Sequence, residues 1–131
     1  MFKIEPIQDK AKQEELCKLF NIEYDIDLFG YYMYDLETQE PMGISQFEIS
    51  GESGYIKDLA EYKDRNDYEA MFILGRQTMN FIDSCGAHII YADDTSSDLR
   101  LLSAIGFKDR DEKGRLLVNT SGMFSGNCGN H

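Results

Sequence analysis

The sequence predicts one α+β domain with a central, mostly antiparallel sheet that contains a single parallel βαβ pair. The segment from Tyr55 to Ala92 has the order strand, polar loop, long helix, strand, which is that of a βαβ crossover. Short aromatic and apolar runs separated by turn residues precede it, as is typical of antiparallel strands. No repeat, linker or low-complexity segment divides the 131 residues. We therefore expect residues 1–131 to form one domain, with 125–131 as a Gly- and Asn-rich tail.

The first half predicts an antiparallel meander with one helix. Phe2–Pro6 is a short first strand. A helix from about Asp9 to Asn21 is indicated by an apolar stripe on one face and charged residues on the other. The aromatic-rich segment Leu28–Tyr34 and the segment Met42–Ser50 then predict a hairpin.

The second half predicts the crossover and a closing hairpin. Its elements are a strand at Tyr55–Tyr62, a loop at Lys63–Asp67, a helix at Tyr68–Cys85 that Gly86 ends, and a strand at His88–Ala92. Thr95 with Asp98 fits a capping box for a short helix that ends at Gly106. Phe107–Arg110 and Leu116–Met123 predict the last hairpin.

Composition limits the classes of partner. With 42% hydrophobic residues the chain is globular, and no apolar run approaches the ~20 residues of a membrane span. The first residues lack an apolar signal core, so we expect a cytoplasmic protein. The net charge of −11 argues against nucleic acid and anionic membrane as partners and mildly favours an amine. Acidity that only serves solubility is the plainer interpretation.

Two copies of one short motif suggest a metal site. Cys85-Gly-Ala-His88 and Cys128-Gly-Asn-His131 supply two Cys and two His, the donor set of a tetrahedral zinc site. The last strand is expected to return the tail to the end of the sheet where Cys85 lies. A buried Cys85, or a Cys85–Cys128 disulfide, would explain the same residues without metal.

The element order and the run Ile105-Gly106-Phe107 resemble the GNAT family of acyl-CoA N-acyltransferases. The resemblance covers residues 1–124 by element order and residues 55–107 by motif. It implies a transferase that uses acetyl-CoA or another acyl-CoA and acts on a small-molecule or peptide amine.

In that family a Gln/Arg-x-x-Gly-x-Gly/Ala loop binds the CoA pyrophosphate at the start of the long helix. The corresponding run here is Arg65-Asn66-Asp67-Tyr68-Glu69-Ala70, in which Arg65 and Ala70 match and Tyr68 replaces the first glycine. Asn66 and Glu69 also predict a capping box that satisfies the free helix donors. Asp67 and Glu69 place two carboxylates where the pyrophosphate would bind, so this loop is predicted to be degenerate.

The resemblance also implies catalytic positions. Backbone groups of Leu59-Ala60-Glu61 would bind the thioester, and Asp58 or Glu61 would act as the base. Strand alternation places Asp58 and Glu61 on opposite faces, so only one can face the acceptor. Leu102 stands where the family usually has its general acid, a tyrosine, and nothing in the sequence selects Tyr31, Tyr32 or Tyr91 as a substitute.

Two functions follow from these patterns. The first is a divergent acyl-CoA-dependent N-acyltransferase. The alternative is a non-catalytic binding domain with the same fold, stabilised by metal at the Cys and His residues and self-associating as a homodimer through a sheet edge.

Overall fold

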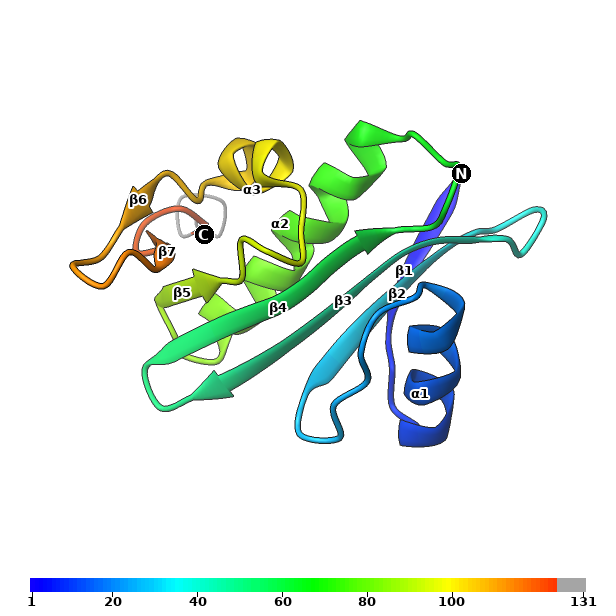
Figure 1. Ribbon diagram of the computed structural model, residues 1–131, viewed down its shortest axis with the longest axis horizontal. Helices are drawn as coiled ribbons and strands as arrows, with labels where there is room; N and C mark the ends of the chain where they lie inside the picture. The colour runs from blue at the N-terminus through cyan, green and yellow to red at the C-terminus, as the bar shows by residue number, and fades with distance from the viewer. Residues whose placement is uncertain (125–131) are drawn as a thin grey trace.

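A computed structural model describes residues 1–124 as a seven-stranded sheet with three helices (Figure 1). The strands lie in the order β1-β2-β3-β4-β5-β7-β6. Along the chain the elements are β1 (Phe2–Pro6), α1 (Lys10–Leu19), β2 (Phe29–Asp35), β3 (Pro41–Ser50), β4 (Ser53–Glu61), α2 (Tyr68–Ser84), β5 (Ile89–Ala92), α3 (Leu99–Ile105), β6 (Asp109–Arg110) and β7 (Leu116–Asn119).

The predicted βαβ crossover is confirmed. β1 to β4 pair antiparallel with their neighbours in sequence, whereas β4 and β5 pair parallel, with Ser53 opposite Ile89 and Ile56 opposite Ala92. α2 links these two strands, as the sequence predicts. β7 then adds antiparallel to β5, so the sheet is mostly antiparallel with one parallel pair.

The long helix α2 exists because its apolar residues recur along one face. Leu74, Met79 and Ile82 are fully buried against the sheet and against α3. Gly86 follows the helix with φ of +93°, a left-handed conformation that suits glycine and turns the chain towards β5. α2 and α3 therefore cover one face of the sheet (Figure 1).

Helix α1 covers part of the opposite face. Leu16, Cys17 and Phe20 pack with Ile44 of β3 in a second, smaller core. α1 lies over the first half of the sheet only, so within residues 1–124 the same face of β5 and β7 has no helix above it (Figure 1).

Strand β4 contains a β-bulge at Lys57. Gln46 of β3 is opposite Asp58, whereas the next residue, Phe47, is opposite Ile56. The extra residue shifts the alternation, so Ile56 and Leu59 both face α2, whereas Asp58 and Ala60 face α1.

Two predicted helix caps are wrong by one or a few residues. The N-cap of α2 is Asp67, whose Oδ1 accepts from the Ala70 N–H at 3.1 Å, so Asn66 and Glu69 do not form the expected capping box. The N-cap of α3 is Asp98, which accepts from the Arg100 N–H at 2.9 Å. Both errors have the same reason: neighbouring cap-forming residues compete, and tertiary contacts select between them.

Most strand boundaries agree with prediction to within one or two residues. The largest difference is in β7, which ends at Asn119 rather than Met123, because the chain turns at Thr120–Phe124. No helix within residues 1–124 is both long and apolar enough to cross a membrane.

Candidate active site

The parallel strands β4 and β5 diverge after four paired residues. Their register runs only from Ser53–Ile89 to Ile56–Ala92, whereas β4 continues to Glu61 and the chain after β5 turns away towards α3. The Asp93 N–H donates to the Ile56 carbonyl at 3.0 Å and marks the point of divergence. The strands thus form a fork that opens towards the N-terminus of α2.

The edge of β4 inside the fork carries backbone groups that no strand pairs. The Leu59 N–H donates to the hydroxyl of Ser97 at 3.0 Å, and the Ser96 hydroxyl donates to the Lys57 carbonyl. Leu59 is one of the residues whose backbone is predicted to bind a thioester, and its N–H indeed points into the fork. A serine from the segment between β5 and α3 now accepts this hydrogen bond.

A small cavity of about 90 Å³ lies at the open end of the fork. Glu61 from β4, Asn66 and Tyr68 at the start of α2 and Asp98 at the start of α3 line it, together with Leu59, Met71 and Leu101. The Asp67 N–H donates to Glu61 Oε2 at 2.6 Å. Five of the nine predicted cofactor-binding residues are therefore neighbours at this point: Leu59, Glu61, Asn66, Asp67 and Tyr68.

The predicted pyrophosphate loop fits an anion poorly. Tyr68 is 46% exposed and lines both the small cavity and a shallow hollow over residues 64–69. Glu69 is the acidic residue of the first helical turn, and Asp67 occupies the cap. Arg65 is paired with Glu40 at 3.6 Å. Two carboxylates and a tyrosine at the start of the helix oppose close approach of a pyrophosphate. The Ala70 N–H, which could otherwise bind the anion, already donates to Asp67.

The two predicted base residues occupy different environments. Asp58 is 2% exposed on the α1 side, where its Oδ2 accepts from Gln46 at 2.7 Å and from Lys57 at 3.2 Å. Glu61 lines the cavity in the fork. They do face opposite sides of the strand. The choice between them stays a prediction, and the geometry favours Glu61.

The predicted substitutes for the general acid are each held by other contacts. Leu102, on α3, is fully buried. Tyr31 stacks on Phe47 with ring centroids 5.8 Å apart, and Tyr32 stacks on Tyr34 at 5.4 Å. The guanidinium carbon of Arg115 lies over the Tyr91 ring, 4.4 Å from the ring centroid. These contacts engage each ring elsewhere.

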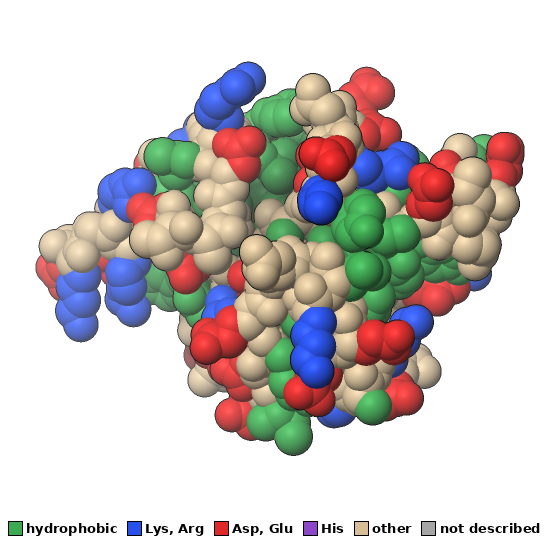
Figure 2. Space-filling view, turned by 45° about the vertical axis from the view of Figure 1, so that its right-hand side comes forward, with side chains coloured by type: hydrophobic (Ala, Val, Ile, Leu, Met, Phe, Trp, Pro, Cys, Tyr) green, Lys and Arg blue, Asp and Glu red, His purple; other side chains and the backbone are tan. Residues whose placement is uncertain are grey.

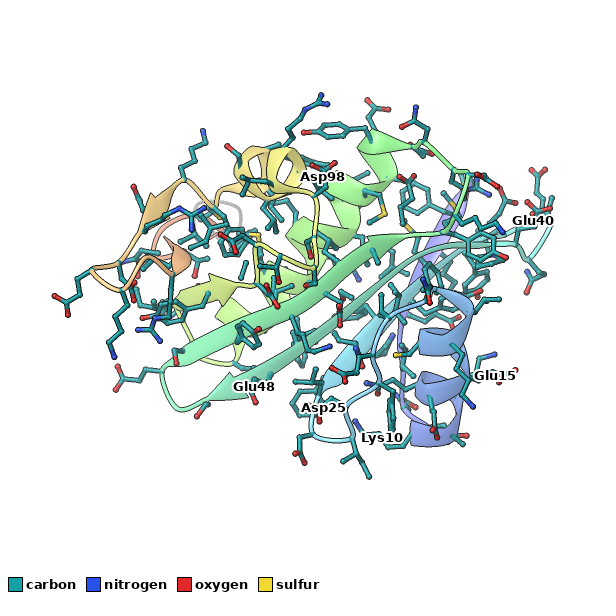
Figure 3. The ribbon with its side chains drawn as sticks, viewed as in Figure 1. Lys10, Glu15, Asp25, Glu40, Glu48 and Asp98 are labelled. Carbon is teal, nitrogen blue, oxygen red and sulfur yellow. The ribbon has the colours of Figure 1, made fainter. Side chains whose placement is uncertain are left out.

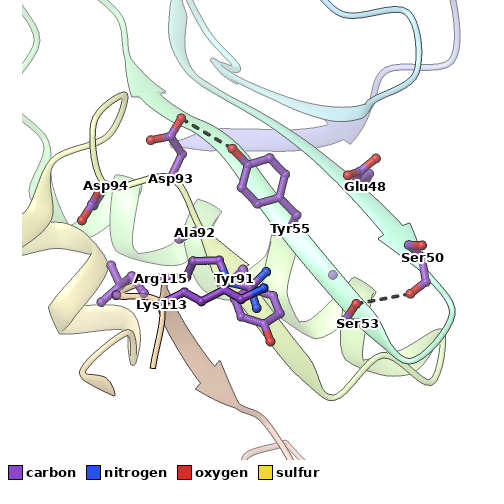
Figure 4. Close-up of a pocket in the computed structure, with 13 residues that line it drawn as sticks. Glu48, Ser50, Ser53, Tyr55, Tyr91, Ala92, Asp93, Asp94, Lys113 and Arg115 are labelled. Carbon is purple, nitrogen blue, oxygen red and sulfur yellow. Dashed lines mark hydrogen bonds between the residues drawn. The ribbon is translucent and has the colours of Figure 1, made fainter. Parts of the chain in front are cut away.

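The sequence did not single out a larger cavity of about 540 Å³ on the sheet face opposite α2 and α3 (Figure 4). Tyr55, Tyr91, Glu48 and Asp93 line it, along with Asp94, Lys113 and Arg115. The Tyr55 hydroxyl donates to Asp93 Oδ2 at 3.5 Å. Burial, then the neighbouring Asp93, raise the pKa of Tyr55, and hydrogen bonds from Thr95 lower the pKa of Asp93. The available signal was position: Asp93 directly follows a strand of the βαβ unit.

The predicted zinc set is only partly within the described residues. Cys128 and His131 lie outside them. Cys85 is exposed and forms no disulfide within residues 1–124, and His88 Nδ1 lies 2.5 Å from Asp83 Oδ1, which accepts from the Thr120 hydroxyl. Within residues 1–124 no cluster of three or more metal-binding side chains occurs, so zinc gains no support from the geometry.

These features define a class of protein: the chain has the fold of the GNAT acyl-CoA N-acyltransferases. Similar solved structures include AtaTR bound with acetyl-CoA, at 15% identity and a TM-score of 0.65 over 95% of this chain and 98% of that one. The ribosomal-protein-S18-alanine N-acetyltransferase of Escherichia coli has 8% identity and a TM-score of 0.65, over 91% of this chain and 90% of its own.

The NatC complex bound to a Gag peptide and CoA has 14% identity and a TM-score of 0.64, over 89% of this chain and 94% of that one. No protein-family model and no curated protein matches the sequence. At these identities the likeness establishes the fold. Other similar structures are AtaT with acetyl-methionyl-tRNAfMet and a KacTA–DNA complex. The expectation of no nucleic-acid partner therefore stays a prediction. Figure 2 shows acidic and basic side chains interspersed on one face of the molecule.

Proposed function

We propose that the protein is an acyl-CoA-dependent N-acyltransferase that transfers an acyl group, most simply acetyl, directly to an amine. The observation that carries the proposal is the fork between β4 and β5, with the Leu59 N–H directed into it beside the start of α2. A backbone N–H in this position can donate to the developing oxyanion of a thioester. The GNAT fold of similar solved structures, some of which contain CoA or acetyl-CoA, supports the same reaction.

In the proposed reaction the amine nitrogen attacks the carbonyl carbon of the thioester. The ammonium first releases one proton to a base or to water, and the neutral amine then attacks. A C–N bond forms, the C–S bond breaks, and a second proton leaves the nitrogen and protonates the departing thiolate. The Leu59 N–H would stabilise the oxyanion. Glu61 is the nearer of the two predicted bases to this point, because it lines the cavity that Leu59 also lines.

Binding of the acyl donor requires a local change. Ser97 accepts from the Leu59 N–H, so a thioester oxygen must displace its hydroxyl. Tyr68 and the carboxylates of the first turn of α2 weaken the pyrophosphate position. We expect an acyl-CoA affinity that is lower than a glycine loop would provide.

Calorimetric titration with acetyl-CoA tests the proposal directly. We expect saturable binding. The free energy of unfolding should rise by about 2.7 kcal/mol when the ligand is at a hundred times its dissociation constant, and the melting temperature should rise with it. Release of free CoA in the presence of an amine panel measures transfer. A folded protein that neither binds acetyl-CoA at millimolar concentration nor releases CoA contradicts the proposal.

A non-catalytic binding domain is the second candidate, and one observation favours it. The unpaired edge of β4 is satisfied by Ser96 and Ser97, so the fork is complete without a ligand. In that case acetyl-CoA leaves the melting temperature unchanged. The zinc hypothesis belongs to this candidate, and metal analysis of the whole chain, which includes Cys128 and His131, tests it.

A further inference from the structure

We propose that the cavity on the open face of the sheet is the acceptor site and that it binds a small aliphatic diamine. This inference deepens the proposed function and rests on it. The cavity reaches the fork at Asp93, whose N–H donates to the Ile56 carbonyl at 3.0 Å. An acceptor in the cavity therefore lies on one side of the fork, while α2, α3 and the predicted acyl-donor site lie on the other.

The ion pairs around the cavity leave specific charges available. Asp94 pairs with Arg110 at 2.8 Å, and Arg115 pairs with Asp111 at 2.7 Å while it covers Tyr91. Within the described part of the chain, neither Glu48 nor Asp93 forms an ion pair. These two carboxylates are therefore available to a positively charged ligand, and the nearby charge of Lys57 also acts on Asp93.

The two carboxylates are placed to bind the two ends of one short ligand. Glu48 is level with Tyr55 and Tyr91 in the strand pairing. Asp93 lies two residues beyond Tyr91, so the two backbones are two strand spacings and two residues apart, roughly 12 Å. Figure 4 shows the Tyr55 ring between them. An aliphatic chain lying along this ring would place one ammonium at Asp93, beside the fork, and the other at Glu48.

The charge state of Asp93 suits binding rather than proton removal. Thr95 donates to Asp93 Oδ1 through both its N–H, at 2.8 Å, and its hydroxyl, at 2.6 Å. These bonds lower the pKa of Asp93, so its carboxylate stays ionised at neutral pH. We assign Asp93 the role of holding the reacting ammonium, and the proton that this ammonium releases passes to water.

A zwitterionic acceptor is the main competing ligand. Lys113 also lines the cavity and makes no ion pair within residues 1–124, so it offers one site for a carboxylate. In Figure 4 Lys113 lies on the side of Tyr91 and Arg115, apart from Glu48 and Asp93. Two unpaired carboxylates against one lysine favour a dication over a zwitterion.

The test is calorimetric or NMR-detected binding to the whole chain without CoA. The probes are 1,4-diaminobutane, n-butylamine and 4-aminobutanoate, which share a four-carbon chain. We expect 1,4-diaminobutane to bind roughly tenfold more tightly than n-butylamine, because a charge-assisted hydrogen bond is worth about that factor. 4-Aminobutanoate should bind most weakly. Equal or tighter binding of 4-aminobutanoate overturns the proposal, as does no binding of any amine.

Variants locate the site. Asp93→Asn and Glu48→Gln are made as separate single variants, and Asp93→Asn keeps an oxygen that can accept from Thr95. Each variant should raise the dissociation constant of 1,4-diaminobutane roughly tenfold. Glu15→Gln on α1, far from the cavity in Figure 3, is the matched control and should change nothing. Unchanged binding in folded Asp93→Asn or Glu48→Gln overturns the assignment, with folding checked by thermal melting.

Acetyl-CoA titration of the same samples separates the two proposals. Diamine binding without acetyl-CoA binding overturns the transferase function and leaves the cavity as an amine site. Acetyl-CoA binding together with equal turnover of all three probes overturns the diamine site alone.

Discussion

The two halves of the sheet differ in how their faces are covered. In the first half α1 covers one face and α2 the other, and the polar groups between them bond to each other. Gln13, Gln46 and Asp58 form a buried chain of hydrogen bonds of 2.9 and 2.7 Å. In the second half, the described residues 1–124 leave one face open, and the strands diverge at a fork where the Lys57 carbonyl and the Leu59 N–H are bonded to serine hydroxyls.

This difference separates polar groups that hold the fold from polar groups that can bind a ligand. A buried group whose hydrogen-bond partners all lie inside the protein cannot form further hydrogen bonds with a ligand, and removal of one partner lowers stability. A group bonded to a mobile hydroxyl or to solvent can exchange that partner for a substrate. Asp58 belongs to the first kind and the Leu59 N–H belongs to the second, whereas Glu48 and Asp93 line the open cavity, where a ligand can reach them.

The largest expected effect is on stability in the covered half. Gln46→Met removes the bonds from Gln46 to Asp58, to the carbonyl of Glu23 and from Gln13, and leaves buried polar groups unpaired. We expect a loss of about 3 kcal/mol in the free energy of unfolding. Urea denaturation measures it. Gln77→Met, at an exposed position on α2, is the control and should stay within about 0.5 kcal/mol.

A loss below about 1 kcal/mol for Gln46→Met would show that the buried network is not structural. The comparison between the halves would then fail at Asp58, and its role as a base would regain weight.

The second effect is on thiol reactivity. Cys17, on the buried face of α1, is fully buried, and burial raises its pKa to about 11, whereas Cys85 is exposed at the end of α2. We expect iodoacetamide to label Cys85 at least ~100-fold faster than Cys17, as measured by peptide mass spectrometry. Because the folded pKa exceeds the unfolded one, the contribution of Cys17 to stability should fall as the pH rises from 9 to 11. Comparable labelling rates would contradict a tightly packed first half.

The third effect is on the acyl donor. Tyr68→Gly restores the glycine that a pyrophosphate loop requires and should tighten acetyl-CoA binding roughly tenfold. Tyr68→Phe retains the ring and should leave the affinity unchanged. Calorimetry measures both. Equal affinities for the two variants would show that Tyr68 does not restrict the site.

The smallest effect is at the edge of β4. Ser97→Ala removes the acceptor of the Leu59 N–H and leaves that donor to the thioester. We expect acetyl-CoA to bind about threefold more tightly, since one neutral hydrogen bond no longer competes. Ser103→Ala, an exposed serine on α3, is the control. Weaker binding in Ser97→Ala would mean that the hydroxyl contacts the ligand instead of competing with it.

Sequence periodicity predicted the crossover well, because a long amphipathic helix between two apolar runs allows few other arrangements. It predicted α2 and its end at Gly86, and the element order that resembles the GNAT family. It could not predict the bulge at Lys57 or the cavity at Tyr55 and Asp93. These depend on strand register and on contacts between residues far apart in the sequence.

The cap of α2 illustrates the same limit. Asn66 and Asp67 are both good N-cap residues, so local propensity does not choose between them. Glu61, at the end of β4, determines the cap, because its carboxylate accepts a hydrogen bond of 2.6 Å from the Asp67 N–H. The base candidates are similar: alternation separated Asp58 from Glu61, and only packing showed which one is buried.

The amino-acid sequence by itself determined the class of fold, the parallel pair and the altered loop at Tyr68, since these follow from local periodicity and residue type. The tertiary structure decided which polar groups are available to a ligand. Availability depends on which partners bond to each group, and those partners come from distant parts of the chain: Gln46 for the Asp58 carboxylate, Ser97 for the Leu59 N–H and Tyr55 for the Asp93 carboxylate.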